Sequence, residues 1–305
     1  MKVITGHTEL PPCVATIGFF DGVHQGHRFL LDQVKQVASD QGMCSSVITF
    51  PIHPRKVLQP EFAPLLLSSP QEKLRLLEGT GVDYCILLPF TCELSRMTAK
   101  SFMQYLRNEF NVRTLVIGYD HRFGHNRAES FEDYQRYGEE LDIHIVQAHA
   151  YTDGEDHVSS SAVRKALQCN DVVGAASFLG YPYSLTGVVT DGYKVGRKIG
   201  FPTANLSVDH PDKLIPKEGV YAVAVYVNEQ KYLGMLNIGH RPTLNNGSNL
   251  SIEVHIMDFS DDIYYEPIRI EFLQFVRPEI KFPTVDELVI QIRKDIEVVK
   301  QCKLF

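Results

Sequence analysis

Apolar runs alternate with amphipathic stretches along the first half of the chain. Leu30, Val34, Val37 and Ala38 recur at the spacing of one helix face. Further helices are predicted over residues 73–77, 102–110 and 131–141, and strands over residues 13–17, 46–50, 84–88, 115–117 and 143–146. Because short apolar strands that alternate with helices form parallel sheets covered on both faces, we expect an α/β domain whose ligands bind beyond the carboxyl ends of its strands.

The alternation ends near Pro182. Two helices are predicted before it, and strands separated by turn signals dominate after it. The helices cover residues 160–167 and 172–179, and the strands cover residues 184–190, 220–227, 232–236, 250–256 and 268–275. A final helix carries an apolar face from Val285 to Val299. We therefore expect two domains, residues 1–182 and 183–305, the second a small β-barrel with a terminal helix.

Composition and charge narrow the class of protein. The formal net charge of −7 argues against a general nucleic-acid binder, because such proteins carry a basic face. No apolar stretch approaches the roughly 20 residues that span a bilayer, and the first residues do not resemble a signal peptide. The six cysteines form no C-x-x-C pair, and several lie within apolar runs. We expect buried, reduced thiols and a cytoplasmic location, with no membrane and no nucleic acid as partner.

Residues 18–27 form a glycine-rich turn between the first strand and the first helix. Such a turn lets backbone N–H groups approach a phosphate closely. His24 and His27 lie at the start of the helix, where they can donate hydrogen bonds to charge on a transferring phosphoryl group. The ordinary alternative is a turn with two surface histidines. A zinc site is disfavoured because no Cys or Glu cluster supports it.

Three further pieces can complete a nucleotide site with this turn. They are Asp21 in the turn, the loop of residues 118–124 that contains Asp120, and the helix start at residues 159–164. The helix start offers hydroxyls, backbone N–H groups and the guanidinium of Arg164, which suit a polyphosphate. Taken alone, the serines there are an ordinary helix N-cap.

A second candidate site follows the strand at residues 184–190. Spaced glycines suit a loop that closes over phosphates, although no P-loop motif is present. Thr203 and Asn205 offer oxygen ligands of the kind that Mg²⁺ accepts beside phosphates and water. Glu253 can accept a proton from an attacking hydroxyl. The ordinary alternatives are a flexible hairpin, local turn capping by Thr203 and Asn205, and a solvent-facing Glu253.

These motifs together resemble the bacterial bifunctional riboflavin kinase/FAD synthetase family. The stretch from Gly18 to His27 is similar to its HxGH nucleotidyltransferase signature, and residues 200–205 are similar to its PTAN motif. Residues 49–54, 118–124, 159–164, 237–243 and 253–256 match further motifs of the family. The resemblance covers essentially the whole chain. It implies a Rossmann-like, doubly wound nucleotidyltransferase domain followed by a riboflavin kinase barrel.

For the first domain the resemblance implies adenylyl transfer, in which the FMN phosphate attacks the α-phosphate of ATP and pyrophosphate leaves. His24 and His27 would stabilise the charge, and Asp120 would lie in the flavin pocket. The chain departs from some members of the family at His121, where they carry Phe. The implied ATP and phosphate contacts here are Gly18, Phe19, Asp21, Gly22, Ser159, Ser160, Ser161 and Arg164.

For the second domain the resemblance implies phosphorylation of riboflavin. Thr203 and Asn205 would hold Mg²⁺ and ATP, and Glu253 would activate the 5′-hydroxyl of riboflavin toward the γ-phosphate. The remaining implied contacts are Gly192, Gly196, Gly200 and Pro202 for ATP, with Arg241, Gln291 and Asp295 for the flavin. The implied ligands and products are riboflavin, FMN, FAD, ATP, ADP and pyrophosphate.

Three other interpretations remain open from the sequence. In one, a single domain is active and the other is retained for binding. In another, both pockets belong to a non-catalytic flavin-binding protein. A different cytidylyl- or adenylyltransferase fused to a barrel fits the histidine motif but does not account for residues 202–205.

Overall fold

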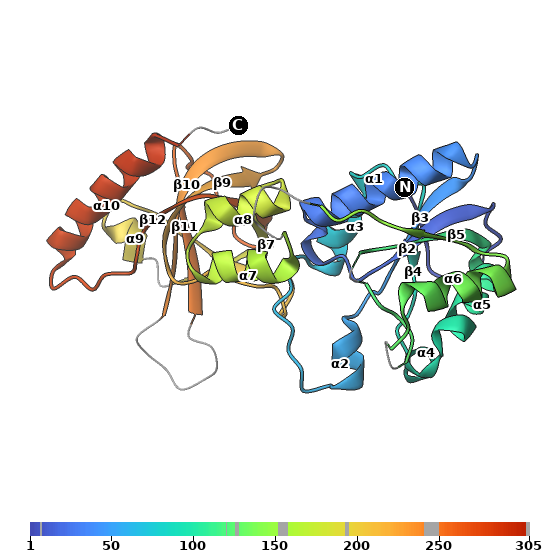
Figure 1. Cartoon of the computed structure of the whole chain (residues 1–305). Helices are drawn as coiled ribbons and strands as arrows, with labels where there is room; N and C mark the ends of the chain where they lie inside the picture. Colours follow the sequence, from blue (N-terminus) through green and yellow to red (C-terminus); the bar gives the residue numbers. More distant parts are fainter. Residues whose placement is uncertain are drawn as a thin grey trace. The chain divides into compact units, whose positions relative to one another are not determined.

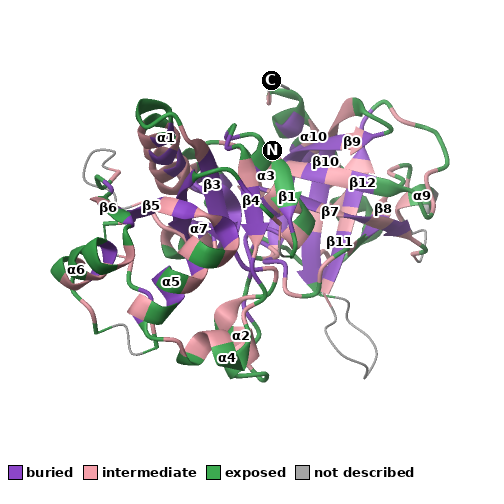
Figure 2. Cartoon of the chain, turned by 90° about the vertical axis from the view of Figure 1, so that its right-hand side faces the viewer, coloured by how far each residue is buried: buried purple, intermediate pink, exposed green. Residues whose placement is uncertain are grey.

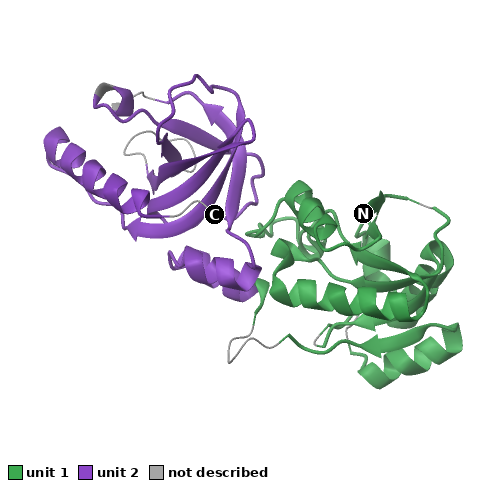
Figure 3. Ribbon diagram, turned by 90° about the horizontal axis from the view of Figure 1, so that it is seen from above, with its two compact units in different colours: residues 1–160 green, residues 161–305 purple. Residues whose placement is uncertain are grey.

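A computed structural model describes the chain over residues 1–6, 8–119, 121–125, 128–151, 158–192, 195–240 and 250–302. The chain divides into two compact units, Met1–Ser160 and Ser161–Phe305 (Figure 3). The division falls before the two helices that precede Pro182. These helices therefore group with the second unit, whereas the change in sequence pattern places the boundary after them.

The first unit is built on a six-stranded sheet in which the paired strands are parallel (Figure 1). The strand order is β1-β4-β3-β2-β5-β6. The strands are β1 (Lys2–Ile4), β2 (Cys13–Ile17), β3 (Cys44–Thr49), β4 (Tyr84–Leu87), β5 (Val112–Ile117) and β6 (His144–Gln147). From β2 the chain moves through β3 to β4 and then crosses back to form β5 on the other side of β2. This crossing puts a topological switch point at the carboxyl ends of β2 and β5, where such sheets bind ligands.

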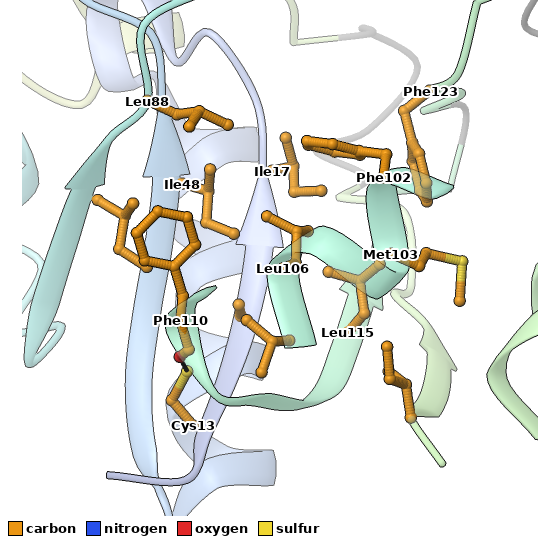
Figure 4. Close-up of a cluster of buried hydrophobic side chains, with 14 of the residues drawn as sticks. Cys13, Ile17, Ile48, Leu88, Phe102, Met103, Leu106, Phe110, Leu115 and Phe123 are labelled. Atoms are coloured by element: carbon orange, nitrogen blue, oxygen red, sulfur yellow. Dashed lines mark hydrogen bonds between the residues drawn. The ribbon is translucent and has the colours of Figure 1, made fainter. Parts of the chain in front are cut away.

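Helices cover both faces of this sheet, as the sequence predicts. Ala15 and Leu115 face a core shared with helices α5 (Ala99–Phe110) and α6 (Phe131–Leu141). Val14 and Val116 point to the opposite face, where they pack with α1 (Gln25–Asp40). Figure 4 shows the first of these cores, in which side chains of α5 pack against the strands and the Cys13 thiol donates to the Phe110 carbonyl at 3.4 Å.

The second unit contains a closed barrel in which the strand order is β10-β11-β8-β7-β12-β9 and all pairs are antiparallel. The strands are β7 (Ser184–Thr190), β8 (Ala204–Val208), β9 (Gly219–Val227), β10 (Gln230–His240), β11 (Leu250–Ile256) and β12 (Pro267–Arg277). The terminal helix α10 (Val285–Lys300) packs on β9, β10 and β12. Figure 2 shows how burial concentrates on the strands, while helices such as α10 also carry exposed residues.

Short helices fill the connections between these elements. They are η1 (Asp21–Val23), α2 (Pro54–Leu58), α3 (Pro70–Glu78), α4 (Cys92–Arg96), α7 (Ser160–Gln168), α8 (Val172–Leu179) and α9 (Val195–Lys198). Side chains fix several helix ends. α3 begins with a capping box between Ser69 and Glu72, and α6 begins with one between Ser130 and Asp133. α5 ends at Asn111, which adopts the left-handed conformation with φ 51°.

The parallel sheet, the barrel and the terminal helix are thus confirmed. The sequence patterns miss β1, β8 and the short helices α2, α4 and α9. The expectation that the thiols are buried holds for Cys13 and Cys85, whose pKa values burial raises to about 11. It is wrong for Cys92 and Cys169, which are exposed because they lie at the ends of surface helices. Among the described residues, no helix has the length and apolar character needed to cross a membrane.

Candidate active sites

The turn after β2 is bent by unusual backbone conformations. The backbone N–H of Gly18 donates to the Ile48 carbonyl at 3.0 Å, which extends the pairing of β2 with β3. The chain then passes through positive φ angles at Phe20 (55°), Gly22 (76°) and Val23 (37°). Positive φ at bulky residues costs energy and is found mainly at functional sites. The turn therefore has the strained geometry expected of a functional loop.

His24 and His27 lie together at the start of α1. The backbone N–H of His27 donates to Nδ1 of His24 at 3.3 Å, so His24 is the N-cap of the helix. Because this Nδ1 accepts, the neutral His24 ring carries its hydrogen on Nε2. The two rings are stacked, with centroids 3.6 Å apart. At position 26 a Cβ atom would lie 3.3 Å from the His24 ring, which explains the glycine there.

The surroundings of His27 favour its neutral form. Burial lowers the pKa of His27 well below its usual range, and the charges of His24 and Lys73 lower it further. Its Nδ1 atom is buried and has no hydrogen-bond partner within the described part of the chain. Since a buried polar atom normally has a hydrogen-bond partner, this nitrogen is suited to form a hydrogen bond with a bound substrate.

Asp21 holds a neighbouring loop. Its carboxylate is buried and accepts the backbone N–H of Leu67 at 2.9 Å, the backbone N–H of Ser68 at 3.0 Å and the Ser68 hydroxyl at 3.3 Å. The Ser68 hydroxyl oxygen in turn accepts the backbone N–H of Gly22 at 3.0 Å. The structure thus gives Asp21 a role in shaping the turn, and its expected contact with ATP stays a prediction.

The other predicted residues of this site lie in several places. Phe19 stacks edge-on against His53, with centroids 4.6 Å apart. The Ser160 hydroxyl donates to the backbone carbonyl of Asp21 at 3.1 Å, so the start of α7 contacts the turn. Ser159 directly precedes this helix, whereas Ser161 and Arg164 belong to the second unit, and their phosphate contacts stay a prediction. Asp120 lies outside the described residues.

The second candidate site is formed by two neighbouring barrel strands. Glu253 of β11 is paired directly with Asn205 of β8. The Thr203 hydroxyl donates to Oε2 of Glu253 at 3.3 Å. The Thr203 and Glu253 side chains, 50 positions apart in the chain, are therefore in contact, and Asn205 is the strand partner of Glu253. This donor set fits Mg²⁺, which takes few protein oxygen ligands and completes its shell with phosphates and water.

Two of the predicted glycines, Gly192 and Gly196, pack closely at this site, whereas a Cβ atom at Gly200 would meet nothing within 4 Å. A Cβ atom at Gly192 would lie 2.1 Å from Nδ2 of Asn205, and one at Gly196 would lie 2.3 Å from the Phe201 carbonyl oxygen. Gly200 has φ +89°, a conformation that other residues rarely adopt. A cavity of about 360 Å³ reaches this site at Thr203, and its lining does not include Asn205 or Glu253. Its lining includes Arg197, Pro202, Thr203, Phe259 and Tyr264.

Comparison with known proteins identifies the family. Residues 7–162 match the family model for FAD synthetase, and residues 179–303 match the model for riboflavin kinase. The chain belongs to the bifunctional riboflavin kinase/FMN adenylyltransferase family. A member from Listeria monocytogenes is 38% identical over 284 residues, which cover 92% of this chain and 90% of the relative. A member from Escherichia coli is 36% identical over 302 residues, which cover 97% and 96%.

A solved structure also resembles the chain over its full length. It is described as a macrolide-efflux protein from Streptococcus pneumoniae, with 31% sequence identity and a TM-score of 0.92. The match covers 99% of this chain and 100% of that structure.

The residues expected to bind the flavin in the kinase barrel are Asp295, Gln291 and Arg241. Asp295 is buried, and both of its oxygens accept from Nε of Arg277, at 3.1 and 2.9 Å. Gln291 donates to the same carboxylate at 2.8 Å. These contacts attach α10 to the end of β12, so Asp295 and Gln291 set the helix position, and direct flavin contact stays a prediction. Arg241 lies outside the described residues.

Two further residues, one beside a family motif and one within the motif at residues 253–256, have no role predicted from the sequence. Lys73 of α3 is buried beside the histidine turn, and its ammonium donates to the Phe50 carbonyl at 2.7 Å. The sequence does carry a signal for the burial of Lys73, because it shares one helix face with the apolar Leu77 at a spacing of four residues. His255 lies in the kinase barrel, where its Nδ1 is 2.8 Å from the Pro202 carbonyl. No pattern in the sequence marks this contact.

Proposed function

We propose that this protein makes FMN from riboflavin in its barrel and FAD from FMN in its parallel-sheet domain. In the first reaction the 5′-hydroxyl of riboflavin attacks the γ-phosphate of ATP, which yields FMN and ADP. In the second the FMN phosphate attacks the α-phosphate of ATP, which yields FAD and pyrophosphate. The observation that carries the proposal is the assembly of two separate sites, with stacked histidines at a helix start in one unit and Glu253 paired with Asn205 in the other.

In the kinase reaction Glu253 acts as the general base. Its carboxylate accepts the proton of the riboflavin hydroxyl as the new oxygen–phosphorus bond forms. Thr203 and Asn205 would hold Mg²⁺ beside the ATP phosphates, where a bound cation would supply neutralisation of the phosphate charge. The Thr203 hydroxyl, which is 3.3 Å from Glu253 in the structure, keeps the carboxylate beside the phosphates.

In the adenylyltransferase reaction His24 and His27 act on the α-phosphate. His24 presents Nε2–H because its Nδ1 caps the helix. His27 is neutral in the free protein, and the approach of an anionic phosphate favours its protonated, donating form. Backbone N–H groups at the start of α1 add a favourable dipole. Arg164 with Ser159, Ser160 and Ser161 holds the β- and γ-phosphates, and Asp120 lies in the flavin pocket.

Each of the two reactions is assigned to one domain. Residues 1–182 carry adenylyl transfer and residues 183–305 carry phosphorylation. We place the enzyme in the cytoplasm, which is supported by six cysteines that are all free in the structure.

Two variants test the two-site model. The wild-type protein is incubated with Mg²⁺ and ATP plus riboflavin or FMN, and FMN, FAD, ADP and pyrophosphate are quantified. His27→Ala should lower FAD formation by about 100-fold or more and leave FMN formation unchanged, and Glu253→Ala should do the reverse. Exposed residues of the same types, His144→Ala and Glu297→Ala, serve as matched controls.

The outcomes separate the proposal from its rivals. Loss of both activities in one folded variant, or of neither, contradicts the two-site model. Formation of only one product by the wild-type protein indicates a single working domain. Flavin binding without release of ADP or pyrophosphate indicates a non-catalytic flavin-binding protein.

A further inference from the structure

Lys73 is buried, with only 2% of its surface exposed. Its Nζ lies 2.7 Å from the Phe50 carbonyl oxygen, 3.1 Å from the Phe19 carbonyl oxygen and 3.3 Å from the Thr49 hydroxyl. An ammonium group has three hydrogens to donate, and all three find an acceptor. The three acceptors are neutral oxygens. Lysine is almost never fully buried unless its ammonium is paired, and here two main-chain carbonyls and one hydroxyl bind it.

The acceptors belong to the two strand ends that build the histidine turn. Phe19 lies in the turn after β2, and Thr49 and Phe50 lie at the end of the neighbouring strand β3. The Thr49 hydroxyl also donates to the Phe19 carbonyl, at 3.0 Å. In addition, the Lys73 ammonium lies 4.0 Å from the centre of the Phe19 ring, within the range of a cation–π interaction. Lys73 thus joins α3 to both strand ends.

The charge of Lys73 also acts on the turn. Burial lowers the pKa of Lys73 to about 8, while Asp21 and Cys85 act in the opposite direction. The side chain therefore remains mostly protonated at pH 7. The groups that lower the pKa of His27 besides burial are the neighbouring His24 and the Lys73 ammonium. A positive charge at this place attracts anionic substrates. It also disfavours protonation of His27 before an anionic substrate is bound.

We propose that Lys73 is a positioning residue for adenylyl transfer, which anchors the histidine turn through the Phe19 carbonyl and places a buried positive charge next to it. The inference rests on the proposed formation of FAD in this unit. Lys73 touches no reacting atom in this role. It acts through the turn and through His27.

The variants Lys73→Met and Lys73→Arg test the role, with Lys35→Met as the matched control. Lys35 also donates to a main-chain carbonyl, that of Thr80 at 2.7 Å, but from the surface of α1. For Lys73→Met we expect kcat/KM for FAD formation to fall at least tenfold, with FMN formation within twofold of the wild type. Lys73→Arg, which keeps the charge, should retain more activity than Lys73→Met. Lys35→Met should behave as the wild type.

The decisive measurement is the titration of His27. Its ring proton is followed by NMR in the wild type and both Lys73 variants, together with the pH profile of FAD formation. Removal of a positive neighbour must raise the pKa of His27 in Lys73→Met and leave it nearly unchanged in Lys73→Arg. An unmoved His27 pKa in Lys73→Met, or equal activity losses in the two variants, overturns the proposal.

Failure of the proposed function and failure of the role of Lys73 give different results. If the wild-type protein forms no FAD, the proposed function is wrong, and the His27 titration still decides whether the charge of Lys73 acts on the turn. If the wild type forms FAD and Lys73→Met matches it within twofold, the inference about Lys73 is wrong. If the first unit of Lys73→Met does not fold, as lost hydrogen-exchange protection of the β2 and β3 amides would reveal, Lys73→Arg carries the test. A His27 pKa and a pH profile like those of the wild type then support the role of the charge, and a displaced pH profile contradicts it.

Discussion

The replacement Asp21→Ala separates two roles for the carboxylate in the histidine turn. In the structure this side chain is buried and accepts hydrogen bonds from the backbone N–H groups of Leu67 and Ser68 and from the Ser68 hydroxyl. The sequence motif instead predicts a contact with ATP. If the structural contacts dominate, the replacement must destabilise the first unit even without substrate.

The magnitude follows from the contacts. Hydrogen bonds to a charged group contribute about 1.5–3 kcal/mol each, and bonds that share donors do not add fully. We therefore expect Asp21→Ala to cost about 3–5 kcal/mol of unfolding free energy. Asp21→Asn should cost about 1–2 kcal/mol, because its remaining oxygen can occupy the place of Oδ1, which accepts from both Leu67 and Ser68.

Native-state hydrogen exchange of the amides in β2 and β3 reports the stability of this unit. A loss of about 3 kcal/mol lowers their protection roughly 150-fold. Asp32→Ala is the matched control, since that carboxylate is exposed and pairs only with Lys35 of the same helix in the described contacts. Unchanged protection in Asp21→Ala, together with a raised KM for ATP in FAD formation, would refute the structural role and favour direct contact with the nucleotide.

Three further predictions concern the histidine turn and the attachment of α10. Gly26→Ala places a methyl group 3.3 Å from the His24 ring and should displace that ring from its stack with His27. FAD formation should then fall about tenfold while FMN formation is unchanged. Normal FAD formation would contradict the idea that the stacked arrangement is needed. The pKa of His27 is lower in the folded than in the unfolded state, so the unfolded state binds more protons below about pH 6.5 and stability falls as the pH is lowered from there. His27→Gln should flatten urea-unfolding free energies between pH 7 and 5, and an unchanged slope would disprove the assignment. Arg277→Ala leaves Asp295 buried without its cation and should cost about 3–5 kcal/mol of unfolding free energy, measured by hydrogen exchange of the α10 amides. The double variant Arg277→Met with Asp295→Leu should recover most of this loss, because no buried charge then remains unpaired. If the double variant recovers no stability, the unpaired charge is not the cause of the loss.

Much of the fold follows from the sequence because local signals agree. The helix predicted over residues 131–141 has the same bounds in the structure, where a capping box at Ser130 starts it and the left-handed Asp142 ends it. Strand β8 was missed because its residues Asn205 and Ser207 are polar and no apolar run marks it. Its pairing with β7 and β11 holds it in the barrel, and such long-range pairing is invisible in a local pattern.

The candidate sites divide in the same way. His24, His27 and Glu253 could be proposed from motifs because each lies in a short, recognisable stretch. The partners that position them could not, because they come from distant segments. Asp21 and Leu67 are separated by 46 positions in the chain, and Lys73 and Phe19 by 54. A motif identifies the reacting groups, but the packing of the fold decides what orients them.

The contacts of Asp21 and Lys73 are reciprocal, and this explains how a strained turn can be held in place. Asp21 extends from the turn to backbone N–H groups at residues 67 and 68, just before α3. Lys73 extends from α3 back to a carbonyl of the turn. Each buried charge takes part of its hydrogen bonding from main-chain groups of the other segment, so a movement of either segment removes hydrogen bonds from a buried charge. The positive φ angles at Phe20 and Val23 persist because this double attachment offsets their cost. The positions of the stacked histidines therefore depend on residues 67–73 as well as on the motif that contains the histidines.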